Sequence, residues 1–138
     1  MIMEINNEVI TLGNGQYGGK GSGLIFIKKI IDENINKSLY PNINISIPNF
    51  TILRTNIFDD FIKRNNLLKK ALSNDDDTSI AMHFQKASLP VEVVGELRNL
   101  IQKLHTPLAV RSSSMLEDSL DEPFAGIYET KMVANNSP

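Results

Sequence analysis

The sequence lacks cysteine, and this absence excludes disulfide bonds and thiolate metal sites. No apolar run approaches the roughly 20 residues that a helix needs to cross a bilayer, and residues 1–8 lack the basic and then apolar regions of a secretory signal. A large excess of charge of one sign is missing as well, because 16 acidic residues nearly balance 14 lysines and arginines, for a formal net charge of -2. We therefore expect a cytoplasmic protein with neither a nucleic-acid nor a membrane partner.

The 138 residues suffice for one domain with a modest core. Short apolar runs bounded by turn residues alternate with segments of helical periodicity, so both strands and helices are expected. The predicted strands are 8–12, 47–53 and 108–110, with a returning extended segment at 124–130. The predicted helices run from about 19–22 to 31 and over 56–65, 66–72, 78–87 and 90–104.

Two of the predicted helices have an apolar face. Thr55 is the expected N-cap of the helix over 56–65, and Pro90 takes a first-turn position in the helix over 90–104. The residues expected to be buried are Ile57, Phe58, Phe61 and Ile62 in the first and Val91, Val94, Leu97, Leu100, Ile101 and Leu104 in the second. Residues 73–77 form an acidic run that is typical of a solvated loop and a helix N-terminus.

Six of the residues 13–23 are glycines, and they precede a predicted helix. Glycines before a helix start allow close approach to an anion, which the free amides and the helix dipole favour. Lys20 stands where an ammonium group would meet a phosphate. The glycines also fit a simple turn, and neither a dinucleotide-binding nor a Walker motif is complete, because the βαβ continuation is missing and Gly21 replaces the required Ser or Thr.

A second candidate segment follows the predicted strand 108–110. Arg111 stands at the strand end and is followed by three serines, 112–114. A guanidinium group beside hydroxyls and backbone amides suits a polyanion, because it gives bidentate hydrogen bonds to phosphate oxygens. The alternative is a strand, a polar loop and a second strand with a surface arginine.

This segment resembles the signature of the N-terminal nucleotide-binding domain of the phosphoenolpyruvate synthase and pyruvate phosphate dikinase family. The matching residues are 110–113 (Val-Arg-Ser-Ser), 117–118 (Glu-Asp), 124–126 (Phe-Ala-Gly) and 129–130 (Glu-Thr). Residues 18–21 (Gly-Gly-Lys-Gly) match the family's lysine motif ahead of a helix near the N-terminus. Residues 47–53 are similar to its Val-Pro-Pro-Gly-Phe-Thr-Ile strand, with Asn49 in place of the glycine.

The resemblance implies an α+β fold over residues 1–138. This would be the N-terminal subdomain of an ATP-grasp fold, a mixed or antiparallel sheet flanked by helices, and an incomplete part of that fold. It places Lys20, Arg111, Gly126 and Thr130 in the nucleotide site, with Lys20 and Arg111 also in the catalytic role of stabilising charge during phosphoryl transfer. The implied cofactors are ATP and Mg²⁺, whose ligands are expected mainly in a second subdomain. That subdomain, the phosphohistidine domain and the acceptor domain are expected to be missing from this chain.

Several interpretations stay open at this point. The chain is either the ATP-binding part of a dikinase that phosphorylates a histidine and then an acceptor such as pyruvate, or an inactive nucleotide- or partner-binding remnant. Glu117 and Asp118 either order the loop or contact magnesium or the acceptor, and Glu129 is either a strand-surface residue or the partner of a cation. Neither His83 nor His105 lies in the family's Thr-Ser-His motif, so both are expected to be structural or surface residues.

Overall fold

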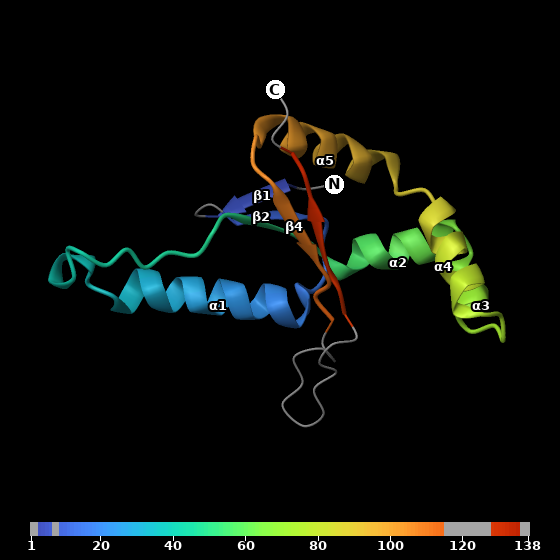
Figure 1. Ribbon diagram of the computed structural model, residues 1–138, viewed down its shortest axis with the longest axis horizontal. Helices are drawn as coiled ribbons and strands as arrows, with labels where there is room; N and C mark the ends of the chain where they lie inside the picture. The colour runs from blue at the N-terminus through green and yellow to red at the C-terminus, as the bar shows by residue number, and fades with distance from the viewer. Residues whose placement is uncertain (1–2, 7–8, 115–127, 136–138) are drawn as a thin grey trace.

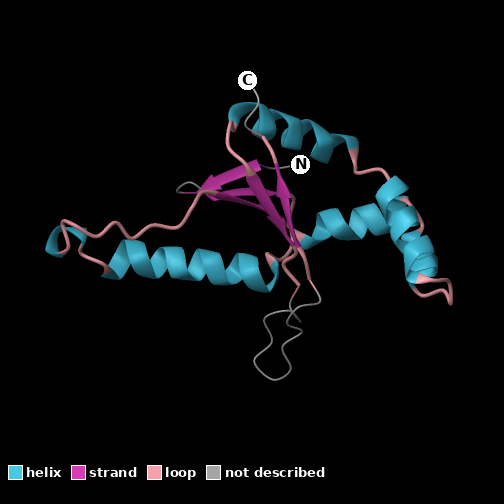
Figure 2. Ribbon diagram, viewed as in Figure 1, coloured by secondary structure: helices cyan, strands magenta, loops and turns pink. Residues whose placement is uncertain are grey.

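The computed structural model describes residues 3–6, 9–114 and 128–135. The strands lie at the centre, with one long helix extending to one side and a run of shorter helices to the other (Figures 1 and 2). In chain order the elements are β1 (Met3–Asn6), β2 (Val9–Leu12), α1 (Gly18–Asn34), the 3₁₀ turn η1 (Lys37–Leu39), β3 (Phe50–Leu53), α2 (Thr55–Arg64), α3 (Leu67–Ala71), α4 (Asp77–Lys86), α5 (Val91–Lys103), β4 (Leu108–Arg111) and β5 (Thr130–Val133). The predicted α+β class is confirmed.

The described strands form two small sheets. In the first, β2 is central and pairs antiparallel with β1 and parallel with β3, so this sheet is mixed. In the second, β4 and β5 pair antiparallel, and the register sets Arg111 opposite Thr130. Asn135, just after β5, donates its side-chain amide to the carbonyl groups of Ile101 and Leu104, which ties this sheet to the end of α5.

The core lies where α2 and α5 meet the first sheet. Leu12 of β2, Ile57 of α2 and Val93 of α5 form one buried cluster, against which the half-buried Ile10 and Leu97 pack. Leu12 and Val93 are the most deeply buried large side chains of the described part. The cluster is small, so each member contributes a large share of the apolar burial, at about 1.5–3 kcal/mol for a fully buried side chain.

The predicted apolar faces were partly wrong. Ile57 is buried as expected, but Phe58 is 61% exposed. In α5 the buried residue is Val93, whereas Val91 and Ile101 are exposed. With valines at 91, 93 and 94, α5 could turn either of two faces toward the core. Contact with Leu12 and Ile57 selects the face that buries Val93.

Several predicted boundaries also shift. β1 was not predicted, and β3 begins at Phe50 rather than at residue 47. β5 begins at Thr130, where the predicted extended segment was expected to end, and residues 124–127 of that segment lie outside the described part. Pro90 is the N-cap of α5 rather than its first residue.

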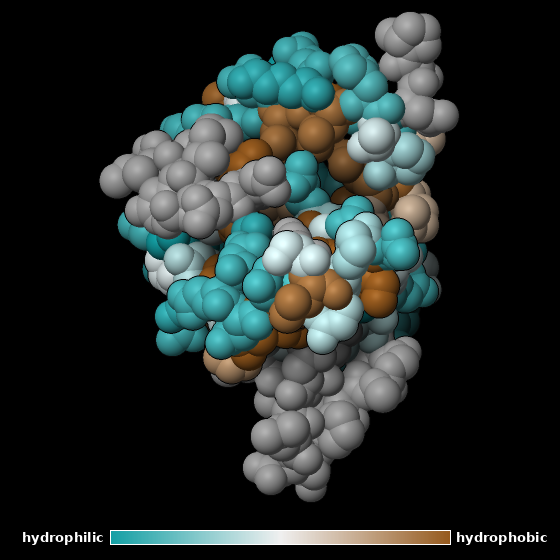
Figure 3. All heavy atoms as spheres, turned by 90° about the vertical axis from the view of Figure 1, so that its left-hand side faces the viewer, coloured by the Kyte–Doolittle hydropathy of each residue, from teal (hydrophilic) through white to brown (hydrophobic). Residues whose placement is uncertain are grey.

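The apolar side of α1 is largely exposed. Phe26 is 63% and Ile27 49% exposed, and beyond the helix Leu39 is 68% exposed. Figure 3, which faces the side toward which α1 extends, shows hydrophobic surface between hydrophilic patches. Within the described ranges, no helix combines the length and the apolar character needed to cross a bilayer.

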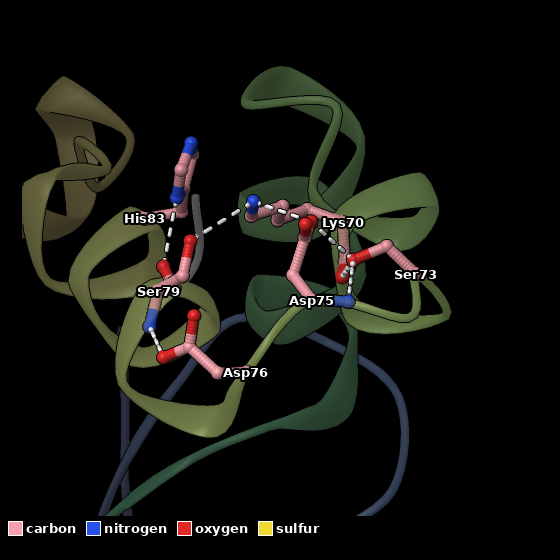
Figure 4. A network of polar contacts seen from close by, with 6 residues as sticks. All are labelled: Lys70, Ser73, Asp75, Asp76, Ser79 and His83. Atoms are coloured by element: carbon pink, nitrogen blue, oxygen red, sulfur yellow. Dashed lines mark hydrogen bonds and ion pairs between the residues drawn. The ribbon is translucent and has the colours of Figure 1, made fainter.

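The acidic run 73–77 connects α3 to α4 through a polar network (Figure 4). Lys70 Nζ lies 2.6 Å from Asp75 Oδ2 and 3.2 Å from Ser79 Oγ, and Ser73 Oγ donates to Asp75 Oδ2 at 2.7 Å. The hydrogen bond from Lys70, followed by that from Ser73, lowers the pKa of Asp75. The pair therefore contributes stability above the ordinary pKa of aspartate and loses it as the pH falls through the lower folded-state pKa, and the contribution is small because the pair is solvent-exposed.

The same run also begins α4. Asp76 is the N-cap, and its Oδ1 accepts a hydrogen bond from Ser79 N at 3.0 Å. One turn on, His83 Nδ1 lies 2.8 Å from the Ser79 carbonyl oxygen. The prediction of a loop and helix N-terminus for these acidic residues is confirmed.

We expect Asp76→Ala to lower the free energy of unfolding by about 0.5–2 kcal/mol, because it removes the side-chain acceptor at the start of α4. Asp76→Ser, which keeps a capping oxygen, should retain most of the stability. Urea denaturation followed by circular dichroism measures both variants. Equal losses for the alanine and serine variants would contradict the capping role.

Candidate functional site

The two segments singled out in the sequence contact each other directly. Ser113 Oγ accepts a hydrogen bond from Gly21 N at 2.9 Å and donates one to the Tyr17 carbonyl oxygen at 3.1 Å. These two hydrogen bonds join residues that are 92 and 96 positions apart in the chain. The Arg111 end of β4 consequently lies beside the first turn of α1, as Figure 1 also shows.

Glycine is required where these segments approach each other. Gly18 has φ +72°, and a Cβ at this position would overlap the main-chain carbonyl of Ser113. Gly21 is buried, and a Cβ there would lie 3.2 Å from Ile52 Cδ1 of β3. Both glycines thus bring the helix start close to its neighbours, and the half-buried Lys20 stands between them in the chain.

The preceding part of the glycine-rich loop has a different role. Asn14 N donates to Asn56 Oδ1 at 2.7 Å, and Gln16 N donates to Thr55 Oγ1 at 3.1 Å. Thr55 N in turn donates to the Gln16 carbonyl oxygen at 3.1 Å. The amides of residues 14 and 16 are therefore used to hold α2, so this half of the loop is a structural turn.

This arrangement corrects the predicted N-cap of α2. The capping position belongs to Arg54, which has extended backbone angles, and no side-chain capping bond is present. Thr55 is the first helical residue, and its hydroxyl faces the glycine-rich loop instead. A tertiary partner has replaced the local capping interaction.

Arg111 and Thr130 are brought together by the register of β4 and β5. Residues directly opposite in an antiparallel pair project to the same face with Cβ atoms about 4.5–5.5 Å apart. Both residues are exposed, so their polar groups reach solvent at this end of the sheet. Lys20, Arg111 and Thr130 therefore belong to α1, β4 and β5, which approach one another near Ser113. Their membership of one nucleotide site stays a prediction.

The fourth predicted site residue, Gly126, lies outside the described part, as do Glu117 and Asp118. On either side of the gap, Tyr128 Oη donates to Ser114 Oγ at 3.1 Å, next to the Arg111–Thr130 pair.

Glu129 forms an ion pair with Lys131, and the hydrogen bond from this lysine lowers the pKa of the Glu129 carboxyl. Glu129 is therefore the partner of a cation, and it lies one residue before β5 rather than on the strand as its other interpretation required.

Arg54 is a basic residue at the loop that sequence reasoning did not identify. Its Nη2 donates to Tyr17 Oη at 3.0 Å and to Thr11 Oγ1 at 3.2 Å. Its guanidinium carbon lies 4.6 Å from the centroid of the Tyr17 ring, within the range of a cation–π contact. No sequence signal links Arg54 to Tyr17, because the contact spans 37 residues.

The arrangement suits an anion with several oxygens. The first turn of α1 presents the positive end of the helix dipole, and Lys20 and Arg111 add two positive charges from separate elements. Among the described residues, no group of three or more His, Asp or Glu side chains is placed to hold a metal ion. His83 and His105 are both exposed and lie on or after helices away from this site, which confirms their prediction as surface residues.

We expect Gly18→Ala to lower the free energy of unfolding by more than about 2 kcal/mol, because a left-handed backbone alone costs an L residue roughly 1–2 kcal/mol. Overlap with Ser113 adds to this cost. Gly23→Ala is the matched control in the same helix, where a Cβ meets nothing within 4 Å, and it should stabilise by about 0.5–1 kcal/mol. Denaturation midpoints of both variants test the assignment, and equal effects would contradict it.

The chain matches a known protein family. The family described as "Pyruvate phosphate dikinase, AMP/ATP-binding domain" matches residues 15–137, which include both contacting segments. No curated protein and no solved structure matches the chain. Because the family match spans nearly all of the 138 residues, the chain belongs to the AMP/ATP-binding domain family of pyruvate phosphate dikinase.

Proposed function

We propose that this chain is the N-terminal, phosphate-binding part of an ATP-dependent dikinase similar to phosphoenolpyruvate synthase. Lys20, Arg111 and Thr130 are its proposed contacts to ATP, together with the backbone at Gly126. The single observation that carries the proposal is the Ser113 bridge, which places the lysine-bearing helix start beside the arginine-bearing strand end. The family's description as an AMP/ATP-binding domain supports the choice of ligand.

The proposed architecture is one half of an ATP-grasp fold. Exposed apolar side chains on α1 and on the β4–β5 pair, such as Phe26 and Met132 at 63% and 69% exposure, support a further wall that packs against this part. We propose that this second subdomain holds the adenine and most Mg²⁺ ligands. The phosphohistidine and acceptor domains are proposed to be further parts of the same cytoplasmic enzyme.

The proposed reaction requires little covalent chemistry from the residues of this chain. Phosphoryl transfer depends on charge neutralisation, alignment and exclusion of water. Lys20 and Arg111 would neutralise phosphate oxygens from two directions, and Thr130 would donate a hydrogen bond from the same face as Arg111. Magnesium, when bound with ATP, would supply further neutralisation of the phosphates.

The catalytic proposal and the remnant alternative both require binding but differ in turnover. In the leading proposal a histidine of a swivelling domain accepts the phosphoryl group and passes it to an acceptor such as pyruvate. The inactive remnant would hold a nucleotide or a partner without transfer. Neither alternative expects this chain alone to turn over ATP.

We expect Lys20→Ala and Arg111→Ala each to weaken Mg·ATP binding by about tenfold or more. A hydrogen bond to a charged group contributes about 1.5–3 kcal/mol, and 1.4 kcal/mol corresponds to tenfold. Lys29→Ala is the control, because this lysine lies on the same helix and pairs with Glu33 at 3.9 Å. Titration of Mg·ATP into the isotope-labelled chain, followed by NMR, gives the dissociation constants even when binding is weak.

The control variant should bind ATP like the parent. A loss of affinity in all three variants would indicate nonspecific charge attraction rather than a site. A folded parent that does not bind ATP, or site variants that bind as tightly as the parent, would refute the proposed function.

A further inference from the structure

The Ser113 hydroxyl lies across the first turn of α1. An α-helix closes each turn with a hydrogen bond from N–H of residue i to the carbonyl of residue i−4, and Gly21 and Tyr17 are such a pair. Ser113 Oγ bonds to both of these groups, at 2.9 Å and 3.1 Å. Ser113, two residues after β4, is thus hydrogen-bonded to the first turn of α1.

We propose that Ser113 is a positioning residue, which fixes the first turn of α1, and with it Lys20, relative to Arg111 so that both cations engage one phosphate chain. This inference rests on the proposed function. It assigns Ser113 a role through its contact with the helix rather than through contact with the nucleotide.

The geometry allows little adjustment at this contact. A hydroxyl both donates and accepts, and Ser113 uses both capacities on backbone groups. Its own carbonyl occupies the space that a Cβ on Gly18 would need. The helix start is therefore fixed to Ser113 by two hydrogen bonds and by direct backbone packing.

Tyr17 is held from its other end as well. Its carbonyl accepts from Ser113, while its ring and hydroxyl contact Arg54, 4.6 Å from the ring centroid and 3.0 Å from Oη. The residue before α1 thus connects β4's end to Arg54 at the start of α2. Loss of the Ser113 hydroxyl would remove its two hydrogen bonds to the helix start. The backbone packing at Gly18 and the close approach of Gly21 to Ile52 would remain.

A positioning role differs from a general stabilising role in how it couples to Lys20. If Ser113 acts by placing Lys20, removing its hydroxyl weakens ATP binding only while the lysine is present. If it acts on stability alone, its effect on affinity is the same with or without Lys20. A double-mutant cycle measures this coupling.

The experiment compares Ser113→Ala, Ser113→Thr, Lys20→Ala and the double variant Ser113→Ala/Lys20→Ala, with Ser22→Ala as the control. Ser22 is an exposed serine on the same helix. Two quantities are measured by NMR on the isotope-labelled chain, namely the exchange rate of the Gly21 amide and the dissociation constant for Mg·ATP.

We expect Ser113→Ala to stay folded and to exchange the Gly21 amide faster, because both hydrogen bonds of the hydroxyl are lost. It should bind ATP about three- to tenfold more weakly, a coupling of the size found within one hydrogen-bond network. Ser113→Thr should restore both quantities, and Ser22→Ala should leave both unchanged. In the Lys20→Ala background, Ser113→Ala should change the affinity by less than about twofold, because coupled sites are not additive.

The outcomes separate this inference from the proposed function. A folded parent that does not bind ATP refutes the proposed function and this inference together. A parent that binds ATP while Ser113→Ala binds equally well refutes the inference alone. The inference also fails if Gly21 exchange is unchanged in Ser113→Ala, or if the loss of affinity persists in full without Lys20.

Discussion

The contact between Ser113 and the first turn of α1 is the constraint on which the site depends. β4 and β5 form their own sheet and share no strand with the sheet of β1, β2 and β3, so strand pairing does not place Arg111 near Lys20. Closing a chain segment of 92 residues costs conformational entropy. The hydrogen bonds of one hydroxyl group do not offset that cost. Backbone packing at Gly18 and the tie from Asn135 to the end of α5 act together with the hydroxyl.

The glycines of the loop divide into two structural roles. Those at positions 13 and 15 have positive φ values, and a Cβ at either would collide with Asn56 or Thr55. Those at 18 and 21 allow the helix start to meet β4's end and β3. The glycines at these four positions are therefore explained by close packing. The basic side chains would be the part of the proposed site that a ligand recognises.

Much of the fold could be predicted because it depends on local patterns, and the errors occur where a distant partner decides. The apolar runs located β2, β3 and β4, and periodicity located every long helix. Val93 was missed because the phase of α5 depends on Leu12 and Ile57, and Thr55 was misassigned because its hydroxyl bonds to Gln16.

Motif spacing and the family resemblance selected Lys20, Arg111 and Thr130 as the predicted site residues, and their role stays a prediction. They did not identify the Ser113 bridge or the Arg54–Tyr17 contact, since neither partner lies near the other in sequence.

The exposure of the proposed site would limit how strongly this chain binds a nucleotide on its own. Arg111 and Thr130 are open to solvent, where the effective dielectric constant is high and charge interactions are weak and screened by salt. A covering wall that excluded water would strengthen the same contacts without moving them, because Coulomb energies rise as the local dielectric falls. Prior alignment of the helix start and the strand end by Ser113 would then matter most, since a closed site gains from charges that are already in place.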